Sequence, residues 1–398
     1  MGPTAIHYQA ALTVVCSILC SSGQEPGERA QLWQRDFSSV AAYEKSVEPN
    51  RQRLRTIIGA ADARQPMAAL EVISNTAAQP LVAETEAFTV QAVRWPVFEG
   101  VFGEGLWLQP KAESVARMVA IPDAGQTPEM VVGLAPGLAP ERQFARRLAE
   151  NGCEVLVPVL IDRRAQASGL GRHIIGYEVQ KVLAAVDALK VQSSGAKVQG
   201  SNIGLVGYGE GGLVAFYTAA LDTRIQAAVV SGYFDSRPRL GEEPIYRQVL
   251  GLLPEFGSAE VASLIAPRAL IVEFSAAPGK FPPPDYESVE AELERARSLL
   301  KAGDPKLFDH FKLICGNEGM ATGPGSDRAL AVLLNALGAP IEHIKQPAKA
   351  PVDLRENFDP AQRQQRQVKE LESFTQKLLE ESERARTNSL PNKAKTNP

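Results

Sequence analysis

The stretch Ile203-Gly-Leu-Val-Gly-Tyr-Gly-Glu-Gly-Gly-Leu213 decides the fold class of this chain of 398 residues. Its first half is an apolar strand pattern, and its second half opens a helix. The glycines between them allow a strand and a helix to back closely against each other across a strained turn. Gly209 lies at the apex of this predicted turn. The apex residue therefore displays only backbone at one edge of the predicted sheet.

The sequence around this turn predicts an α/β domain over residues 89–340, with a mostly parallel central sheet and helices on both faces. Strand-like and helix-like segments alternate there, which is typical of such a sheet. The expected strands are 90–98, 105–108, 115–121, 154–161, 202–206, 225–230, 268–274 and 311–315. The expected helices begin at Pro140 and at residues 172, 211, 288 and 327.

The segments outside this domain have different patterns. Residues 24–88 show apolar residues at three- and four-residue steps, which predicts an N-terminal helical extension interrupted at Pro49 and Gly59. Residues 341–398 begin as a proline-rich linker. Asp359-Pro360 then opens an amphipathic helix, and the tail from Thr387 is expected to be disordered.

The first 23 residues resemble a signal peptide. An apolar run from Ala10 to Leu19 ends in Ser21, Ser22 and Gly23, and it is too short to span a bilayer. This predicts an exported protein, periplasmic or extracellular. The first nine residues carry no Lys or Arg, so an ordinary apolar helix in a cytoplasmic protein is the alternative.

Composition excludes several classes of partner and site. Lys and Arg total 42 against 46 Asp and Glu, a formal net charge of −4, so we expect no nucleic-acid partner. Cys16 and Cys20 fall in the leader, which leaves Cys153 and Cys315 as two expected buried thiols. Four scattered histidines and no cysteine pair at metal spacing predict no metal site, and no cofactor is expected.

Several motifs together resemble the dienelactone-hydrolase and acetyl-xylan-esterase branch of the α/β-hydrolase superfamily. They are Gly204-Leu-Val-Gly-Tyr-Gly-Glu-Gly-Gly212, Ala219-Ala-Leu-Asp-Thr-Arg-Ile225, Ala227-Ala-Val-Val-Ser-Gly-Tyr233 and Ile265-Ala-Pro-Arg-Ala-Leu-Ile271. The resemblance covers residues 89–340 and implies an α/β-hydrolase fold. It also implies a nucleophile elbow of the G-x-S-x-G type at Gly209.

The catalytic triad of that family does not transfer to this chain. The nucleophilic serine falls on Gly209, which has no oxygen to attack a carbonyl. The acid is expected just after the strand 270–274, where no carboxylate occurs before Asp285. The base histidine is expected after the strand 312–315, where Glu318 stands instead. The sequence therefore predicts a catalytically inactive hydrolase fold that binds an ester, an acylated carbohydrate or a protein, the last through its C-terminal helix.

The candidate binding residues surround the elbow. In the family, the residue after the nucleophile and the loop after the third strand supply oxyanion-hole amides, which correspond here to Glu210 and to Asp123 and Ala124. Tyr208 and Glu318 complete the set of elbow and loop candidates. The Glu210 side chain either faces this site or faces solvent while it stabilises the first helical turn.

His173 is the histidine nearest to the expected site. It either contacts a ligand or only packs at the start of its helix.

Two further interpretations remain open. The protein could be an active carboxylic-ester hydrolase that uses unusual residues or a partner chain. Alternatively, Gly207, Gly209 and Gly212 match the dinucleotide fingerprint G-x-G-x-x-G, with Asp235 as a distant acidic residue. The second interpretation is weakened because strand–helix pairs precede this motif.

Overall fold

The computed structural model describes residues 32–73, 81–163, 173–192, 202–237, 242–276 and 284–389. The predicted signal peptide, residues 1–23, lies outside these ranges. The prediction for Cys16 and Cys20 therefore lies outside them as well.

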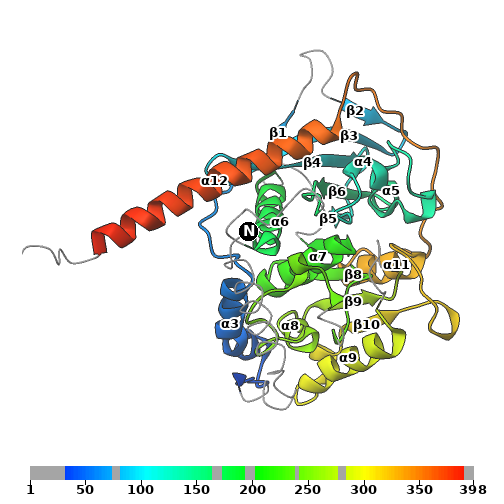
Figure 1. The fold of residues 1–398 in the computed structure, drawn as a ribbon. Coiled ribbons are helices and arrows are strands. Elements are labelled where there is room, and N and C mark those ends of the chain that lie inside the picture. Colours follow the sequence, from blue (N-terminus) through cyan, green and yellow to red (C-terminus); the bar gives the residue numbers. More distant parts are fainter. Residues whose placement is uncertain are drawn as a thin grey trace, which may run out of the picture.

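A ten-stranded mixed sheet forms the centre of the molecule (Figure 1). Its order is β1-β3-β4-β6-β5-β7-β8-β9-β10, and β2 pairs with β3. The run from β6 to β10 is parallel, whereas β1 to β4 join antiparallel. The strands are β1 (Glu71–Val72), β2 (Leu81–Glu84), β3 (Phe88–Phe98), β4 (Val101–Pro110), β5 (Ala116–Ile121), β6 (Cys153–Pro158), β7 (Ile203–Tyr208), β8 (Ile225–Ser231), β9 (Ala269–Glu273) and β10 (Phe311–Ile314). The predicted mostly parallel sheet is confirmed.

Helices cover both faces of this sheet, as predicted. One buried core joins the sheet to α3 (Val40–Ile57), α6 (Ile174–Gln192), α7 (Glu210–Leu221), α8 (Ser258–Ser263) and α9 (Tyr286–Leu299). A second core joins the opposite face to α4 (Pro128–Val132), α5 (Phe144–Glu150) and α11 (Asp327–Ala336). Every residue of β5, β6 and β7 is buried, as expected for parallel strands covered on both sides. The shorter elements are η2 (Pro140–Arg142), η6 (Ile245–Arg247), α10 (Pro305–Phe308) and η7 (Asn317–Gly319).

The N-terminal extension differs from its prediction in two respects. Helix α3 runs through Pro49 without a break, although proline removes a backbone donor from a helix. Tertiary contacts hold this helix, because the buried Arg51 guanidinium donates to the carbonyls of Ala220 and Leu264. The segment before residue 89 is also not wholly helical, since β1 and β2 pair with β3.

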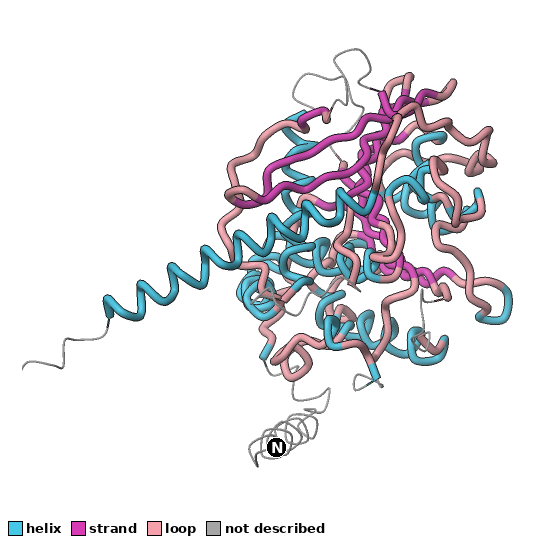
Figure 2. Tube along the Cα trace, turned by 45° about the horizontal axis from the view of Figure 1, so that its top comes forward, coloured by secondary structure: helices cyan, strands magenta, loops and turns pink. Residues whose placement is uncertain are grey.

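The C-terminal helix α12 (Pro360–Ser389) docks only in part. Its first half packs on the sheet, where Phe374 stacks on Phe98 at 4.7 Å between ring centroids and Thr375 bonds the Tyr177 hydroxyl. Figures 1 and 2 show its second half extending beyond the rest of the fold. The helix continues through Thr387, where disorder was predicted. Among the helices that the structure describes, none is both long enough and apolar enough to cross a bilayer.

Candidate functional site

The turn between β7 and α7 has the strained geometry that the glycine pattern predicts. Gly209 has φ +58° and ψ −118°, a conformation that side chains rarely adopt. The neighbouring glycines allow close backbone contact, because a Cβ on Gly207 would lie 2.1 Å from the carbonyl oxygen of Gly211. The apex therefore carries no side chain, and its backbone is buried.

The Glu210 backbone amide, which is the candidate ligand-binding group, already donates to a carboxylate of the protein itself. The Glu210 N–H donates to Asp123 Oδ1 at 3.0 Å, and the Gly125 N–H donates to Asp123 Oδ2 at 2.9 Å. Asp123 reaches this amide because β5 and β7 are neighbours, with Ile121 paired to Gly207, so that the loops after both strands meet. Ala124, the next residue of the loop, is buried there. The Asp123 carboxylate thus binds the first amide of α7.

The Glu210 side chain is buried in an ionic cluster. Only 3% of the residue is exposed. Arg247 donates to its carboxylate, and Arg163 Nε lies 3.6 Å from Glu210 Oε2. Arg247 is the last residue of η6, which contacts α6. Glu210 is buried, so the alternative that its side chain faces solvent is wrong. The two arginines provide the charge that compensates the buried carboxylate.

Tyr208 links the elbow to the loop after β9. Its ring is buried, and its hydroxyl donates to the carbonyl of Ala276 at 2.9 Å. Burial raises the pKa of the Tyr208 hydroxyl, and the negative charge of Asp123 raises it further. This hydroxyl therefore stays protonated at neutral pH and acts as a hydrogen-bond donor.

His173 lies one step away from the elbow. Its Nδ1 accepts from the Ile175 N–H at 3.3 Å at the start of α6. Burial lowers the pKa of its imidazole, and the nearby Arg163 guanidinium lowers it further. A neutral histidine that caps its own helix matches the packing interpretation, and none of its described contacts involves Gly209, Glu210 or Asp123.

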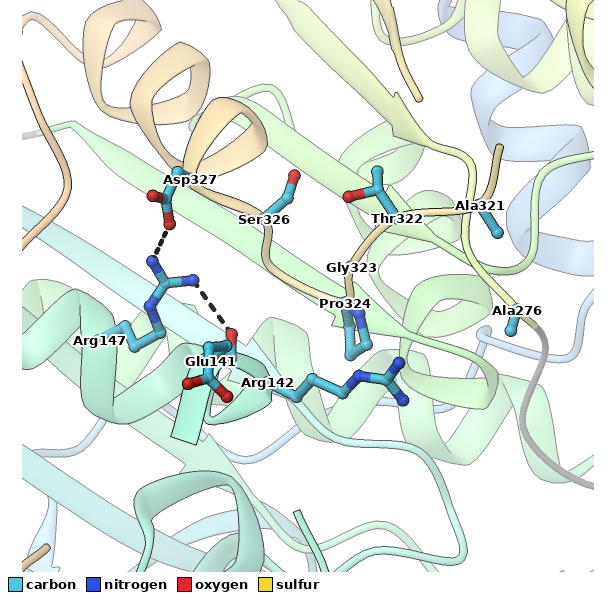
Figure 3. Close-up of a pocket in the computed structure, with 10 residues that line it drawn as sticks. All are labelled: Glu141, Arg142, Arg147, Ala276, Ala321, Thr322, Gly323, Pro324, Ser326 and Asp327. Atoms are coloured by element: carbon cyan, nitrogen blue, oxygen red, sulfur yellow. Dashed lines mark hydrogen bonds and ion pairs between the residues drawn. The ribbon is translucent and has the colours of Figure 1, made fainter. Parts of the chain in front are cut away.

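A cavity of about 410 Å³ lies next to Tyr208 at the same sheet edge. Figure 3 shows Arg147 bonded to Asp327 and to the Glu141 carbonyl on one side of it, and the Arg142 guanidinium on the other. Its lining also includes the Thr322 and Ser326 hydroxyls; the full set is Glu141, Arg142, Arg147, Ala276, Ala321, Thr322, Gly323, Pro324, Ser326 and Asp327. This cavity is large enough for a small organic ligand.

Residues 116–245, which include β5, the elbow and Arg163, match the dienelactone hydrolase family model. The chain contains a dienelactone hydrolase family domain. The match ends before β9, so the positions expected for the acid and the base lie outside it.

Solved structures show the α/β-hydrolase fold over most of the chain. A protein of Bacteroides fragilis NCTC 9343 that is provisionally named as an acetyl xylan esterase is 17% identical, with a TM-score of 0.53 over 84% of this chain and 92% of that chain. Methylesterase BT1017 is 16% identical, with a TM-score of 0.52 over 79% of this chain and 67% of that chain. The predicted fold is therefore confirmed.

Sequence similarity to a curated protein is more local. YtaP of Bacillus subtilis strain 168, provisionally named as a hydrolase, is 33% identical over 121 residues. The match covers 27% of this chain and 40% of YtaP.

The hydrolase domain has a buried carboxylate that the sequence analysis missed. Glu273 is the last residue of β9, and it accepts from the Ser231 hydroxyl at 2.7 Å and from the Gly325 and Ser326 N–H groups at 2.8 Å each. The family pattern places the acid after this strand, from Ser275 onward, whereas Glu273 lies within the strand. A charged residue at the end of the apolar run Ala269-Leu-Ile-Val was the available signal. Both Glu273 oxygens are occupied, so this carboxylate fixes the loop before α11.

Glu318 is separate from the elbow. It lies in η7 with φ +53°, is exposed, and does not line the cavity. The structure thus brings together Asp123, Ala124, Tyr208, Gly209 and Glu210. His173 is near Arg163, which in turn lies beside Glu210. Within the described chain, no cluster of His, Cys, Asp or Glu has the arrangement of a metal site.

The glycines of the dinucleotide fingerprint serve helix–strand packing. A Cβ on Gly212 would lie 2.8 Å from the carbonyl oxygen of Ser231. The helix N-terminus that would receive a pyrophosphate already holds the Asp123 carboxylate, which would repel one. Asp235 binds the Ser288 hydroxyl at the start of α9 instead of approaching the elbow. The geometry therefore gives no support to dinucleotide binding.

Proposed function

We propose that this protein is a non-hydrolytic member of the dienelactone hydrolase family that binds a small ligand at the elbow edge of its sheet. The observation that carries this proposal is the pairing of Gly209, which has no nucleophilic group, with the Asp123 carboxylate on the Glu210 amide. An ester hydrolase needs a nucleophile and a free oxyanion hole. Here the first is absent from the apex and the second is filled by a negative charge.

The other described groups do not supply a replacement relay. Glu273 has both oxygens bound, His173 uses its Nδ1 to cap α6, and Glu318 is exposed away from the cavity. A triad works as a unit, so its remaining members contribute little once the nucleophile is gone. This supports binding without turnover.

The cavity beside Tyr208 supports a ligand of modest size with polar groups. Arg142, Thr322 and Ser326 offer donors at its wall. The acetyl xylan esterase and methylesterase among the structural neighbours suggest an ester or an acylated carbohydrate as the class to test first. Export of the protein, and a protein partner on α12, are further parts of the proposal that rest on the sequence patterns.

The activity test uses purified protein with an aryl acetate and a fluorophosphonate probe. We expect no turnover above a contaminant control and no covalent label, because no activated oxygen stands at Gly209. Gly209→Ser should remain within about tenfold of that background, since positioned acid–base groups contribute roughly 10²–10⁴-fold to rate and none faces the apex. Robust turnover or labelling of the natural chain would establish the active-hydrolase alternative and overturn this proposal.

The binding test measures the affinity of acetylated and unacetylated xylo-oligosaccharides by calorimetry. We expect Arg142→Gln to weaken binding by about three- to tenfold, the loss of one hydrogen bond to a charged donor in a wet site. Lys301→Gln removes one charge at an exposed position at the end of α9 and serves as the matched control. Equal affinities for both variants would argue against this cavity as the ligand site.

A further inference from the structure

The C-terminal segment contacts the loops on both sides of the elbow, although it follows the hydrolase domain in sequence. Asp359 precedes α12, whose first turns lie next to α4 and to the loop after β6. Gln364 donates to the Leu160 carbonyl at 2.6 Å and accepts from the Asp162 N–H at 3.3 Å. The residue after Asp162 is Arg163, which lies beside Glu210.

The stronger contact is a buried ionic clamp on α4. Arg363 donates through both terminal nitrogens to Glu129, at 2.9 and 2.8 Å, and Arg355 donates to Glu129 Oε1 at 3.2 Å. All three side chains are at most 6% exposed. The guanidinium carbon of Arg355 lies over the Phe358 ring, 3.5 Å from the ring centroid. Both arginines come from the C-terminal segment, so among the described residues the ion pairs of Glu129 are made by this segment.

Glu129 lies only six residues after Asp123, at the end of the same connection. The intervening residues form a compact turn, in which the Gln126 N–H donates to the Asp123 carbonyl at 2.9 Å and Thr127 caps α4. Such a turn moves with the short helix to which it is attached. The position of α4 therefore sets the position of the Asp123 carboxylate.

We propose that Arg363 and Arg355 are positioning residues that hold the Asp123 carboxylate on the Glu210 amide through Glu129. The C-terminal segment is thus part of the candidate site, and it keeps the oxyanion position closed to an external anion. Releasing the clamp frees the loop and uncovers the Glu210 amide, whereas the bond from Gly125 to Asp123 lies within the loop and moves with it. This inference rests on the proposed function only in taking the elbow as the ligand site.

The test is amide hydrogen exchange at Glu210, which donates to Asp123 from α7, in the full-length protein. Glu129→Gln keeps the shape of the side chain and removes its charge. We expect exchange at Glu210 to rise about tenfold, the factor that corresponds to loss of one hydrogen bond. The double variant Glu129→Gln with Arg363→Gln should show the same rise and fold reliably, because Arg355 keeps its ion pair with Asp353.

Two controls make this result specific. Glu99→Gln breaks the exposed ion pair between Glu99 and Lys377, and Lys377 lies on α12, the helix that carries Arg363. We expect no change at Glu210 in this variant. Asp123→Ala removes the acceptor itself and sets the largest rise that the measurement can show.

Three outcomes would overturn the clamp. The first is unchanged exchange at Glu210 in both Glu129 variants while Asp123→Ala raises it. The second is a rise that the Glu99→Gln control reproduces. The third is an equal rise in the core strand β8, which would indicate general destabilisation. Ester turnover by the natural chain would refute the proposed function without moving any of these exchange rates, so the two failures are distinguishable.

Discussion

At the scale of single residues, the glycines around the elbow have two different physical roles. Gly209 adopts φ +58°, a conformation that glycine reaches at a lower cost than a residue with a side chain. Gly207 and Gly211 are needed for space, because another backbone segment occupies the position of their Cβ atoms. All three glycines belong to one sequence motif. In the hydrolases that this chain resembles, only the position of Gly209 carries the catalytic nucleophile.

This distinction gives a prediction for Gly211→Ala. Its Cβ would lie 2.2 Å from the carbonyl oxygen of Ile121, and backbone on β5 cannot move without disturbing the sheet. We expect the free energy of unfolding to fall by about 3 kcal/mol or more. Chemical denaturation monitored by circular dichroism measures it.

Gly100→Ala is the comparison for that measurement. Gly100 has φ +75° but no atom within 4 Å of its Cβ position, so only backbone strain of about 1–2 kcal/mol applies. A cost for Gly211→Ala no larger than for Gly100→Ala would mean that the close approach is not tight.

At the scale of elements, α12 has two halves with different energetics. The first half contributes buried side chains to the core, with Leu371 3% exposed. From Glu381 to Thr387 every residue is exposed, and the helix is supported there only by local pairs such as Glu380 with Arg384. Helical propensity extends a helix that tertiary packing has already nucleated.

We therefore predict that two truncations destabilise the protein to very different degrees. A chain that ends after Glu380 should lose less than about 0.5 kcal/mol of stability, as for other surface changes. A chain that ends after Asp359 should lose roughly 3–5 kcal/mol, because Glu129 loses Arg363 and the contacts of Phe374 disappear. Urea denaturation of both truncated chains tests this, and similar midpoints for the two would contradict it.

At the scale of the whole molecule, buried ion pairs determine how stability depends on pH. Burial alone would raise the pKa of Glu129, but the Arg363 and Arg355 guanidiniums hold it below its ordinary value. Glu178 behaves in the same way, because Lys181 and Arg163 outweigh the effect of its burial. The folded state thus keeps both groups ionised at pH values where the unfolded chain would protonate them.

The sign of the effect follows from these lowered pKa values. Their stabilisation is fully present above the ordinary glutamate pKa of about 4.3 and is lost as the pH falls below it. We expect the melting temperature to fall gently below about pH 6.5, where the unfolded chain protonates His173 before the folded protein does, and to fall steeply below about pH 4.3. Glu129→Gln should flatten this acid slope, and an unchanged slope in that variant would show that Glu129 does not contribute to it.

The sequence determined the parallel part of the sheet, its longer helices and the glycine at the turn apex, because each depends on local patterns. Apolar runs and glycine spacing located β5 to β10 within a few residues, and Gly209 is visible without coordinates. The same patterns placed a break at Pro49, where Arg51 and its distant carbonyl partners keep α3 intact.

Only the tertiary structure decided what fills the site. Asp123 meets the Glu210 amide because β5 lies beside β7, although 87 residues separate the two. Arg363 reaches Glu129 from a helix that begins after the whole hydrolase domain. Side-chain charge and periodicity do not predict such pairings. The pairings arise from the strand order and from the way the C-terminal segment packs back onto the sheet edge.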